Sequence, residues 1–387
     1  MNIGMFTDAY PPQINGVATS VATLKKKLES FGHQVYVFSP TYPGADPTET
    51  GIFRIPSLPY KKVGRISMFY LPGLMKIVRK LELDIIHTHT EFSMGIMGRI
   101  TAARLDVPLV HTMHTLYEKY TGYITPTSHF EPGAKSLARG ITLYFCNSAK
   151  QVIVPTVKVE KMMRDYGVKR PIAVIPTGID LDKFNYRYTM EETWKERDLL
   201  GIAKDDKVML HIGRVAEEKN FSELLSLMAN YLPSNPDAKL LIVGDGPDKG
   251  KFESVSRGLG LERQVIFAGS KPWTRIGLYY QLADILVSAS ESETQGLIYI
   301  EALASGVPVI AKSDACLEGV LQNGVNGYLF SDEAEFIHKV DCILKDARHR
   351  DELSRAAIES VGLFTDISFA RAMEKTYQNT LNQSARA

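Results

Sequence analysis

The sequence predicts an α/β protein built from two doubly wound domains in tandem. Short runs of β-branched and apolar residues alternate with helix-like segments in the first half, and the pattern starts again at Lys207. The strand-like runs are apolar almost throughout, as expected for parallel strands that are covered on both faces. With 387 residues, the chain is long enough for roughly two to three domains.

Each half is expected to form its own parallel sheet. In the first half the predicted strands are residues 2–6, 34–38, 85–88, 108–113, 143–146 and 172–175. In the second half they are 207–214, 240–246, 265–269, 285–287 and 307–311, with helices at 221–231 and 298–305. Ligands of open α/β sheets bind beyond the carboxyl ends of the strands, so two sheets that face each other would enclose one interdomain cleft.

The domain boundary is expected in the polar, weakly patterned stretch 178–204. We therefore predict an N-terminal domain over residues 1–185 and a C-terminal domain over 186–365. A C-terminal helix over about 366–387 is expected to pack back on the first domain.

Composition indicates a cytoplasmic protein. The three cysteines, Cys146, Cys316 and Cys342, are odd in number and far apart, which argues against a disulfide framework and against a zinc site. We expect neither a signal peptide nor a membrane span, because no apolar run approaches 18 residues.

The net charge of +1 hides an asymmetry between the two halves. Residues 1–190 carry 23 Lys and Arg against 14 Asp and Glu, a net charge of +9. Residues 191–387 carry 22 against 30, a net charge of −8. The basic first half suggests contact with an anionic surface.

The most informative segment is 289–311, "ASESETQGLIYIEALASGVPVIA". Gly296 opens a helix whose first amides lack helical partners and attract phosphate. Glu293 and Glu301 flank this point, and hydroxyl groups of a sugar and a ribose are their natural partners. An acidic residue that caps the helix would explain a single glutamate, but it would not explain the whole segment 289–311.

Two cations follow the first strand of the second half. Arg214 comes after a glycine, and Lys219 stands five residues later. Together they could hold a diphosphate, Arg by its fork and Lys as a point charge. Ordinary surface charge beside Glu217 and Glu218 is the alternative, but the Gly296 helix in the same domain favours the diphosphate.

A basic, partly apolar segment covers residues 61–80. An ordinary helix with a wet basic face would explain it alone, but the +9 charge makes peripheral binding to an anionic membrane plausible. No aromatic-interleaved motif supports a nucleic-acid partner. The cationic residues concerned are Lys61, Lys62, Arg65, Lys76, Arg79 and Lys80.

Nearly the whole chain resembles the retaining glycosyltransferases of family four, which have the GT-B fold. The motifs "IPTGIDLDKF", "HIGRVAEEKN", "VGDGPDK" and the paired-glutamate segment are present in order. At finer grain, "TDAYPPQINGVATSV", "DIIHTHTEFSMG", "HTMHTLYEKYTGYI" and "WTRIGLYYQLAD" resemble the bacterial 1,2-diacylglycerol 3-α-glucosyltransferases.

The resemblance implies transfer of a hexose, glucose from UDP-glucose, to the 3-hydroxyl of diacylglycerol on the inner face of the plasma membrane. Arg214 and Lys219 would neutralise the leaving diphosphate, and the backbone at Gly296 and Leu297 would hold phosphate. Glu301 would bind the ribose and Glu293 the hexose. The resemblance also places His114 beside the sugar and Gly244 in the donor site.

The loop after the first strand lacks the G-x-G-x-x-G turn of a dinucleotide site, which disfavours a nicotinamide-dependent oxidoreductase. In the glycosyltransferase reading, Gly16 lets a backbone amide approach the donor phosphate. Asp8 and Tyr10 would then line the acceptor side.

Several alternatives stay open at this point. The acceptor could be a soluble polyol, a sugar or another lipid, and a nucleotide-sugar epimerase or a non-catalytic scaffold is less well motivated. No cofactor or metal is expected: Asp180 and Asp182 match the D-x-D of metal-dependent enzymes, but we favour a turn or a cap. The histidines 87, 89 and 111 near His114 lack metal-site spacing.

Overall fold

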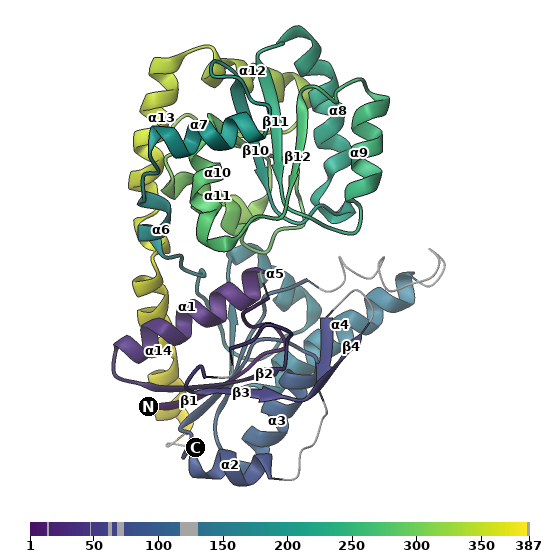
Figure 1. Cartoon of the computed structure of the whole chain (residues 1–387). Coiled ribbons are helices and arrows are strands. Elements are labelled where there is room, and N and C mark those ends of the chain that lie inside the picture. Colours follow the sequence, from purple (N-terminus) through teal and green to yellow (C-terminus); the bar gives the residue numbers. More distant parts are fainter. Residues whose placement is uncertain (14, 47, 61–63, 68–72, 117–130, 385–387) are drawn as a thin grey trace. The chain divides into compact units, whose positions relative to one another are not determined.

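The computed structural model describes residues 1–13, 15–46, 48–60, 64–67, 73–116 and 131–384, and two compact units divide the chain (Figure 1). The first unit comprises Met1–Ile179 and Phe364–Ala387, and the second comprises Asp180–Leu363. The first unit therefore contains the C-terminal helix. Among the described residues, no helix combines the length and the hydropathy that a membrane crossing needs.

A seven-stranded parallel sheet forms the centre of the first unit. Its spatial order is β3-β2-β1-β6-β7-β8-β9. The strands are β1 (Asn2–Phe6), β2 (Gln34–Pro40), β3 (Ile52–Ile55), β6 (Ile85–Thr88), β7 (Leu109–Thr112), β8 (Gln151–Val154) and β9 (Ile172–Val174). The order reverses between β1 and β6, so the loops that follow these two strands meet at a topological switch point.

Helices cover both faces of this sheet, and an antiparallel pair lies outside it. The pair is β4 (Ser57–Tyr60) and β5 (Gly64–Ser67). The helices are α1 (Gly16–Ser30), α2 (Leu74–Lys80), α3 (Ser93–Leu105), α4 (Glu131–Ser148), α5 (Val157–Tyr166) and α14 (Asp366–Ser384).

One predicted strand was wrong. Residues 143–146 belong to α4, and the strand follows it at Gln151–Val154. Phe145 and Cys146 are buried while Tyr144 is 55% exposed, so these residues form one buried stripe of a helix. A short apolar run fits a strand and a buried helix equally well, which explains the error.

Helix α14 is part of the core of the first unit. Phe369, Ala370, Met373 and Tyr377 pack with residues of β1 and β2, such as Met5. The polar edge of the helix is also tied down: Lys27 forms an ion pair with Asp366 at 3.0 Å, and His33 contacts Glu374 at 2.9 Å. Deleting this helix would expose one apolar face of the sheet.

A six-stranded parallel sheet forms the centre of the second unit, in the order β12-β11-β10-β13-β14-β15. The strands are β10 (Lys207–Ile212), β11 (Ala238–Val243), β12 (Val265–Gly269), β13 (Ile285–Ser288), β14 (Val309–Lys312) and β15 (Gly327–Phe330). The helices are α6 (Leu181–Asn185), α7 (Met190–Leu199), α8 (Phe221–Tyr231), α9 (Lys249–Gly258), α10 (Ile276–Gln281), α11 (Leu297–Ala304), α12 (Glu333–Leu344) and α13 (Ala347–Ser360).

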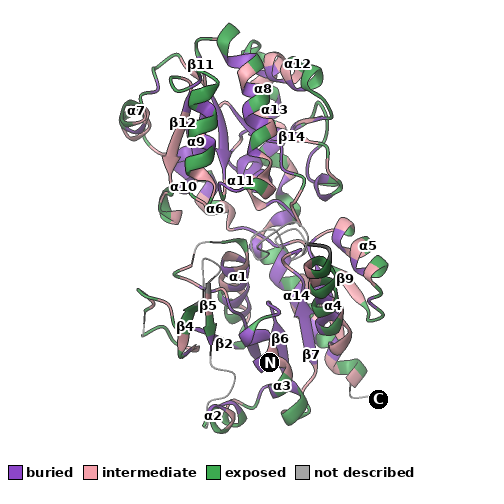
Figure 2. Cartoon of the chain, turned by 90° about the vertical axis from the view of Figure 1, so that its right-hand side faces the viewer, coloured by how far each residue is buried: buried purple, intermediate pink, exposed green. Residues whose placement is uncertain are grey.

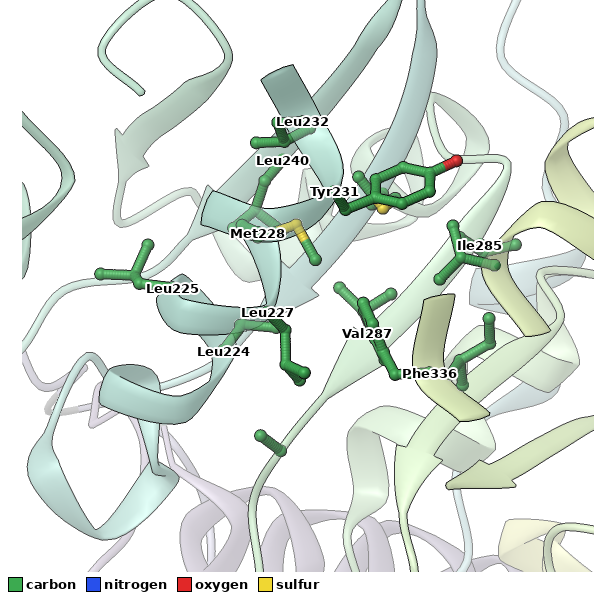
Figure 3. Close-up of a cluster of buried hydrophobic side chains, with 14 of the residues drawn as sticks. Leu224, Leu225, Leu227, Met228, Tyr231, Leu232, Leu240, Ile285, Val287 and Phe336 are labelled. Carbon is green, nitrogen blue, oxygen red and sulfur yellow. The ribbon is translucent and has the colours of Figure 1, made fainter. Parts of the chain in front are cut away.

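Amphipathic helices build the core of the second unit. Leu224, Leu225 and Met228 of α8 belong to one buried cluster with Val287 of β13 and Phe336 of α12 (Figure 3). Figure 2 shows that the central strands are mostly buried, whereas the outer faces of many helices are exposed. These packed layers fix the strand ends, and the loops at those ends carry the predicted site residues.

Candidate active site

The loops that follow β10 and β13 carry the predicted donor residues of the second unit. The two strands are neighbours at the point where the strand order reverses, because β11 and β14 lie on opposite sides of them. Open α/β sheets bind ligands at this crevice. The fold therefore brings Arg214 and Lys219 to the same sheet edge as the 289–296 loop.

A close contact at this edge joins Lys219 and Glu293. Lys219 Nζ donates to Glu293 Oε1 at 2.5 Å, and Ser290 Oγ donates to the same oxygen at 3.0 Å. Burial alone would raise the pKa of Glu293, but the charge and hydrogen bond of Lys219, with Ser290, lower it on balance. Glu293 is therefore an ionised acceptor whose position is fixed from two sides.

Arg214 is more loosely held than Lys219. Its side chain is 47% exposed, and its Nη1 lies 3.9 Å from Glu218 Oε1. A long cation with this exposure can reorient toward an anion. Arg214 thus fits an exposed phosphate contact, while Lys219 is already committed to the buried carboxylate.

Gly244 has a packing role that the sequence did not reveal. A Cβ atom at this position would lie 1.8 Å from the carbonyl oxygen of Gly213, and its φ of +148° is also unfavourable for other residues. The loops after β10 and β11 therefore touch backbone to backbone. This contact explains the glycine without a ligand, and the predicted donor contact of Gly244 remains a prediction.

Helix α11 begins after a glycine. Gly296 is the N-cap residue, with φ of +73°, and as a glycine it has no side chain that could accept hydrogen bonds from the first amides, starting at Leu297. A Cβ atom at Gly296 would lie 2.4 Å from the Tyr299 ring. The site thus needs glycine, and it offers backbone donors beside Glu293.

Glu301 lies further along α11 and is 4% exposed. Tyr280 donates its hydroxyl hydrogen to Glu301 Oε2 at 2.7 Å. Burial raises the pKa of Glu301 to about 7, although Tyr280 and Lys183 act in the opposite direction. Lys183 stacks over the Trp273 ring at 3.9 Å, and burial lowers the pKa of this lysine to about 8.

In the first unit, Asp8 and Tyr10 are buried side chains with polar partners. Asp8 accepts hydrogen bonds from Thr90 Oγ1 at 2.6 Å, from Ser93 Oγ and from the Met94 amide at 3.1 Å. Tyr10 is 2% exposed, and its hydroxyl donates to Glu49. Both side chains are turned into the unit and stabilise the loops, while their predicted place on the acceptor side remains a prediction.

Gly16 is the first residue of α1 and is exposed. The side chain of Asn15 caps this helix by accepting a hydrogen bond from the Ala18 amide at 2.9 Å. The position leaves backbone at a positive helix end, as a phosphate contact requires.

Three histidine rings meet at the carboxyl ends of β6 and β7. His89 lies 3.9 Å from His87 and 5.3 Å from His114 between ring centroids. Burial, with the nearby His111, lowers the pKa of His114 to about 3, so its imidazole is neutral. His111 instead contacts Glu91 at 3.3 Å, and no metal-binding group of three side chains occurs among the described residues.

The predicted membrane residues have mixed environments. Lys76, Arg79 and Lys80 are exposed on α2. Arg65 is held within the β4–β5 pair by hydrogen bonds to Ser57, while Lys61 and Lys62 lie outside the described residues. Among the apolar residues of α2, Leu74 and Val78 are buried, whereas Ile77 is 44% exposed.

Sequence reasoning missed the partners of its own site residues. Ser290, Tyr280 and Lys183 support Glu293 and Glu301, and only Ser290 lies in the motif that drew attention. The contact between His87 and His89 could have been predicted, because residues at i and i+2 along a strand face the same side of the sheet.

Comparisons with known proteins agree with this geometry. Residues 14–183 match the model of "Glycosyltransferase Family 4", and residues 192–360 match "Glycosyl transferases group 1". An alpha-monoglucosyldiacylglycerol synthase of Acholeplasma laidlawii is 34% identical over 99% of this chain and 98% of its own.

The chain belongs to this glycosyltransferase family. A second relative, the alpha-monoglucosyldiacylglycerol synthase of Streptococcus pneumoniae, is 40% identical over 86% of this chain and 76% of its own. The fold matches the sucrose-phosphate synthase of Thermosynechococcus elongatus with a TM-score of 0.79, at 23% identity, over 98% of this chain and 99% of that one. The glycosyltransferase is therefore an enzyme with the GT-B fold, a hexosyltransferase, as the sequence predicted.

Proposed function

We propose that this glycosyltransferase moves glucose from UDP-glucose to the 3-hydroxyl of 1,2-diacylglycerol and yields α-glucosyldiacylglycerol. The observation that carries the donor half is the partly buried Lys219–Glu293 pair beside the start of α11, which has a glycine as its N-cap residue. The acceptor half rests on the two relatives that are 34% and 40% identical and are named for this product.

The residues of the second unit suit a nucleoside diphosphate sugar. Glu301 would accept from ribose hydroxyls, because a buried carboxylate gains most from two hydroxyl donors. The amides at the start of α11, with Arg214 and Lys219, would hold the diphosphate. Glu293 would orient the hexose, since the ionised carboxylate is fixed by Lys219 and Ser290.

The reaction breaks the bond between the hexose C1 and the diphosphate oxygen. Arg214, Lys219 and the helix end stabilise the charge that develops on that oxygen, which lowers the barrier without a metal ion. The lipid hydroxyl attacks C1 from the face that the diphosphate leaves. The departing phosphate oxygen takes the hydroxyl proton, and the anomeric configuration is retained.

Residues of the first unit would complete the reaction. Gly16 leaves backbone exposed at the start of α1, where it would suit a phosphate, and a neutral His114 can hydrogen-bond to a sugar hydroxyl. We include His114 as a catalytic residue on these grounds.

The lipid acceptor requires contact with a membrane, and the first unit offers cations for it. Lys76, Arg79 and Lys80 project from α2 beside the exposed Ile77. The exposed Leu58 and Ile66 are cross-strand partners in the β4–β5 pair. Each base near an anionic surface contributes about 1 kcal/mol, so the contact should be peripheral and sensitive to salt.

The direct test incubates the enzyme with several UDP-hexoses and with diacylglycerol in anionic vesicles, a soluble polyol or no acceptor. We expect a glycolipid from UDP-glucose and diacylglycerol alone. Transfer only to the polyol would favour the second candidate, the same donor chemistry on a soluble acceptor. An isomerised UDP-sugar without acceptor would indicate an epimerase.

Membrane contact is tested by vesicle flotation. Reversing Lys76, Arg79 and Lys80 to glutamate should reduce binding to anionic vesicles on the order of 100-fold at low salt. The matched control reverses Lys345, Arg348 and Arg355, which are exposed on the second unit. Equal losses in both triple variants would reject a specific contact through α2.

A further inference from the structure

The structure points to His89 as the residue that positions His114 and fixes which of its nitrogens carries hydrogen. We infer that His89 acts in the transfer reaction through His114, without touching the substrate itself. This inference rests on the proposed role of His114 as a catalytic residue.

The first observation is the stack of three rings. His89 lies between His87 and His114, with centroid distances of 3.9 and 5.3 Å and interplanar angles of 39° and 24°. His87 and His89 come from β6 and the residue that follows it, and His114 follows β7. The adjacent strands therefore set the spacing of the rings.

The second observation is a hydrogen bond between two imidazoles. His89 Nδ1 and His114 Nε2 are 3.1 Å apart, so one of these nitrogens carries a hydrogen and the other a lone pair. Two imidazolium ions would place N–H groups against each other. The contact therefore excludes a stack in which both rings are charged.

The third observation is the far nitrogen of His89. Its Nε2 is buried and has no hydrogen-bond partner among the residues that the structure describes. A buried lone pair at Nε2 is more readily tolerated than a buried N–H group, since orphaned N–H groups are the rarer case. This places the hydrogen of His89 on Nδ1, makes His114 Nε2 the acceptor and leaves the hydrogen of His114 on Nδ1.

The stack is anchored at its other end. His87 Nδ1 is 2.7 Å from the Tyr377 hydroxyl of α14, and His87 Nε2 is 2.6 Å from Thr112 Oγ1. Hydroxyl groups can donate or accept, so both contacts suit a neutral His87. The other titratable groups nearby are His111 and its partner Glu91, which lie on the opposite side of β7 from this stack.

The test compares two replacements of His89. His89→Phe keeps a stacking ring but removes the hydrogen bond, so kcat should fall on the order of 10- to 100-fold. The KM for UDP-glucose and the affinity for UDP should change less than about 3-fold, because most of the proposed donor contacts belong to the second unit. His89→Asn restores a polar group near the Nδ1 position and should recover part of kcat.

Two controls separate this inference from a structural role and from the proposed function. His33 contacts α14 through Glu374, as His87 does through Tyr377, but it lies outside the stack. His33→Phe should therefore leave kcat unchanged. Nitrogen-15 NMR of the imidazoles should show one tautomer of His114 in the wild type and a mixture in His89→Phe. The inference is wrong if His114→Ala abolishes transfer while His89→Phe keeps kcat within twofold of the wild type. It is also wrong if His114→Ala abolishes transfer while His114 keeps a single tautomer in His89→Phe. If His114→Ala itself is active, the catalytic role proposed for His114 fails.

Discussion

Lys219 and Glu293 are 74 residues apart in the sequence, yet Lys219 Nζ lies 2.5 Å from Glu293 Oε1 at the switch point of the second sheet. The side chains are 17% and 13% exposed, so solvent screens the pair only weakly. The pair positions the Lys219 ammonium and the Glu293 carboxylate next to each other before any substrate binds. A polar substrate can use both without reorganisation of the site.

Replacing Lys219 by alanine should lower kcat on the order of 100- to 1,000-fold, because the leaving charge loses a fixed cation. The pKa of Glu293 should also rise, since burial then acts without its main counterweight. Steady-state kinetics measure kcat, and calorimetric titration with UDP follows the pKa of Glu293. Lys251→Ala is the matched control, because its ion pair with Glu217 is exposed; an equal loss there would show that the effect is one of general charge.

The stability of the protein should depend on pH through Glu301. A carboxyl whose pKa is higher in the folded chain than in the unfolded chain takes up a proton on folding between these values. The free energy of unfolding should therefore fall as pH rises from 4.5 to about 7, by roughly 3 kcal/mol for this group. Urea unfolding at pH 5 and pH 8 should show this loss in the wild type, and Glu301→Gln should reduce it.

Donor binding should show the opposite trend with pH. The ionised form of Glu301 is the better acceptor for ribose hydroxyls, so UDP affinity should increase as pH rises through about 7. Removing the Tyr280 hydroxyl, which lowers this pKa, should move the midpoint to higher pH. Calorimetry on the wild type, Tyr280→Phe and Glu301→Gln checks this, and a wild-type affinity independent of pH from 6 to 8 would contradict it.

Gly16→Ala separates catalysis from stability. Alanine favours the helix by up to about 1 kcal/mol over glycine, so the melting temperature should stay the same or increase. Transfer should nevertheless decline, and Gly16→Val should abolish it, because a side chain would keep the phosphate away from the start of α1. UDP binding should persist. Undiminished transfer in Gly16→Val would refute this role of the loop.

Asp8→Ala should act on stability. The loss of the carboxylate leaves Thr90, Ser93 and the Met94 amide without their buried acceptor, at a cost of about 2 to 4 kcal/mol. Thermal unfolding measures this change. Asp46→Ala, which removes an exposed carboxylate that binds Thr48, should leave the unfolding midpoint almost unchanged. An Asp8→Ala protein that is stable but inactive would instead support a role of Asp8 on the acceptor side of the active site.

Most parallel strands were predictable because they are buried on both faces, but β3, β8 and β15 were not predicted. Residues 2–6, 85–88 and 265–269 match β1, β6 and β12, and helix α8 has the predicted bounds. The β4–β5 pair was missed, since a half-exposed hairpin has no continuous apolar run. The strand predicted at 143–146 is helical, because the stripe of α4 gives the same local signal as a strand.

The motifs predicted the site residues of the second unit but not their supports. Glu293 and Glu301 stand out as charged residues in an apolar segment. The partners Lys219 and Tyr280 are distant in sequence, so their contacts depend on strand order. Asp8 and Tyr10 show the converse, because a polar residue after a strand can be a buried anchor as readily as a binding group.

The central claim is retaining transfer of glucose to diacylglycerol. The most direct measurement is the NMR spectrum of the lipid formed from carbon-13-labelled UDP-glucose and 1,2-diacylglycerol in anionic vesicles, with the Lys219→Ala variant as the blank. We expect one glucosyl group on the 3-hydroxyl in the α configuration, and almost none from the variant. A β-linked product, or release of free glucose without any glycolipid, would contradict the claim.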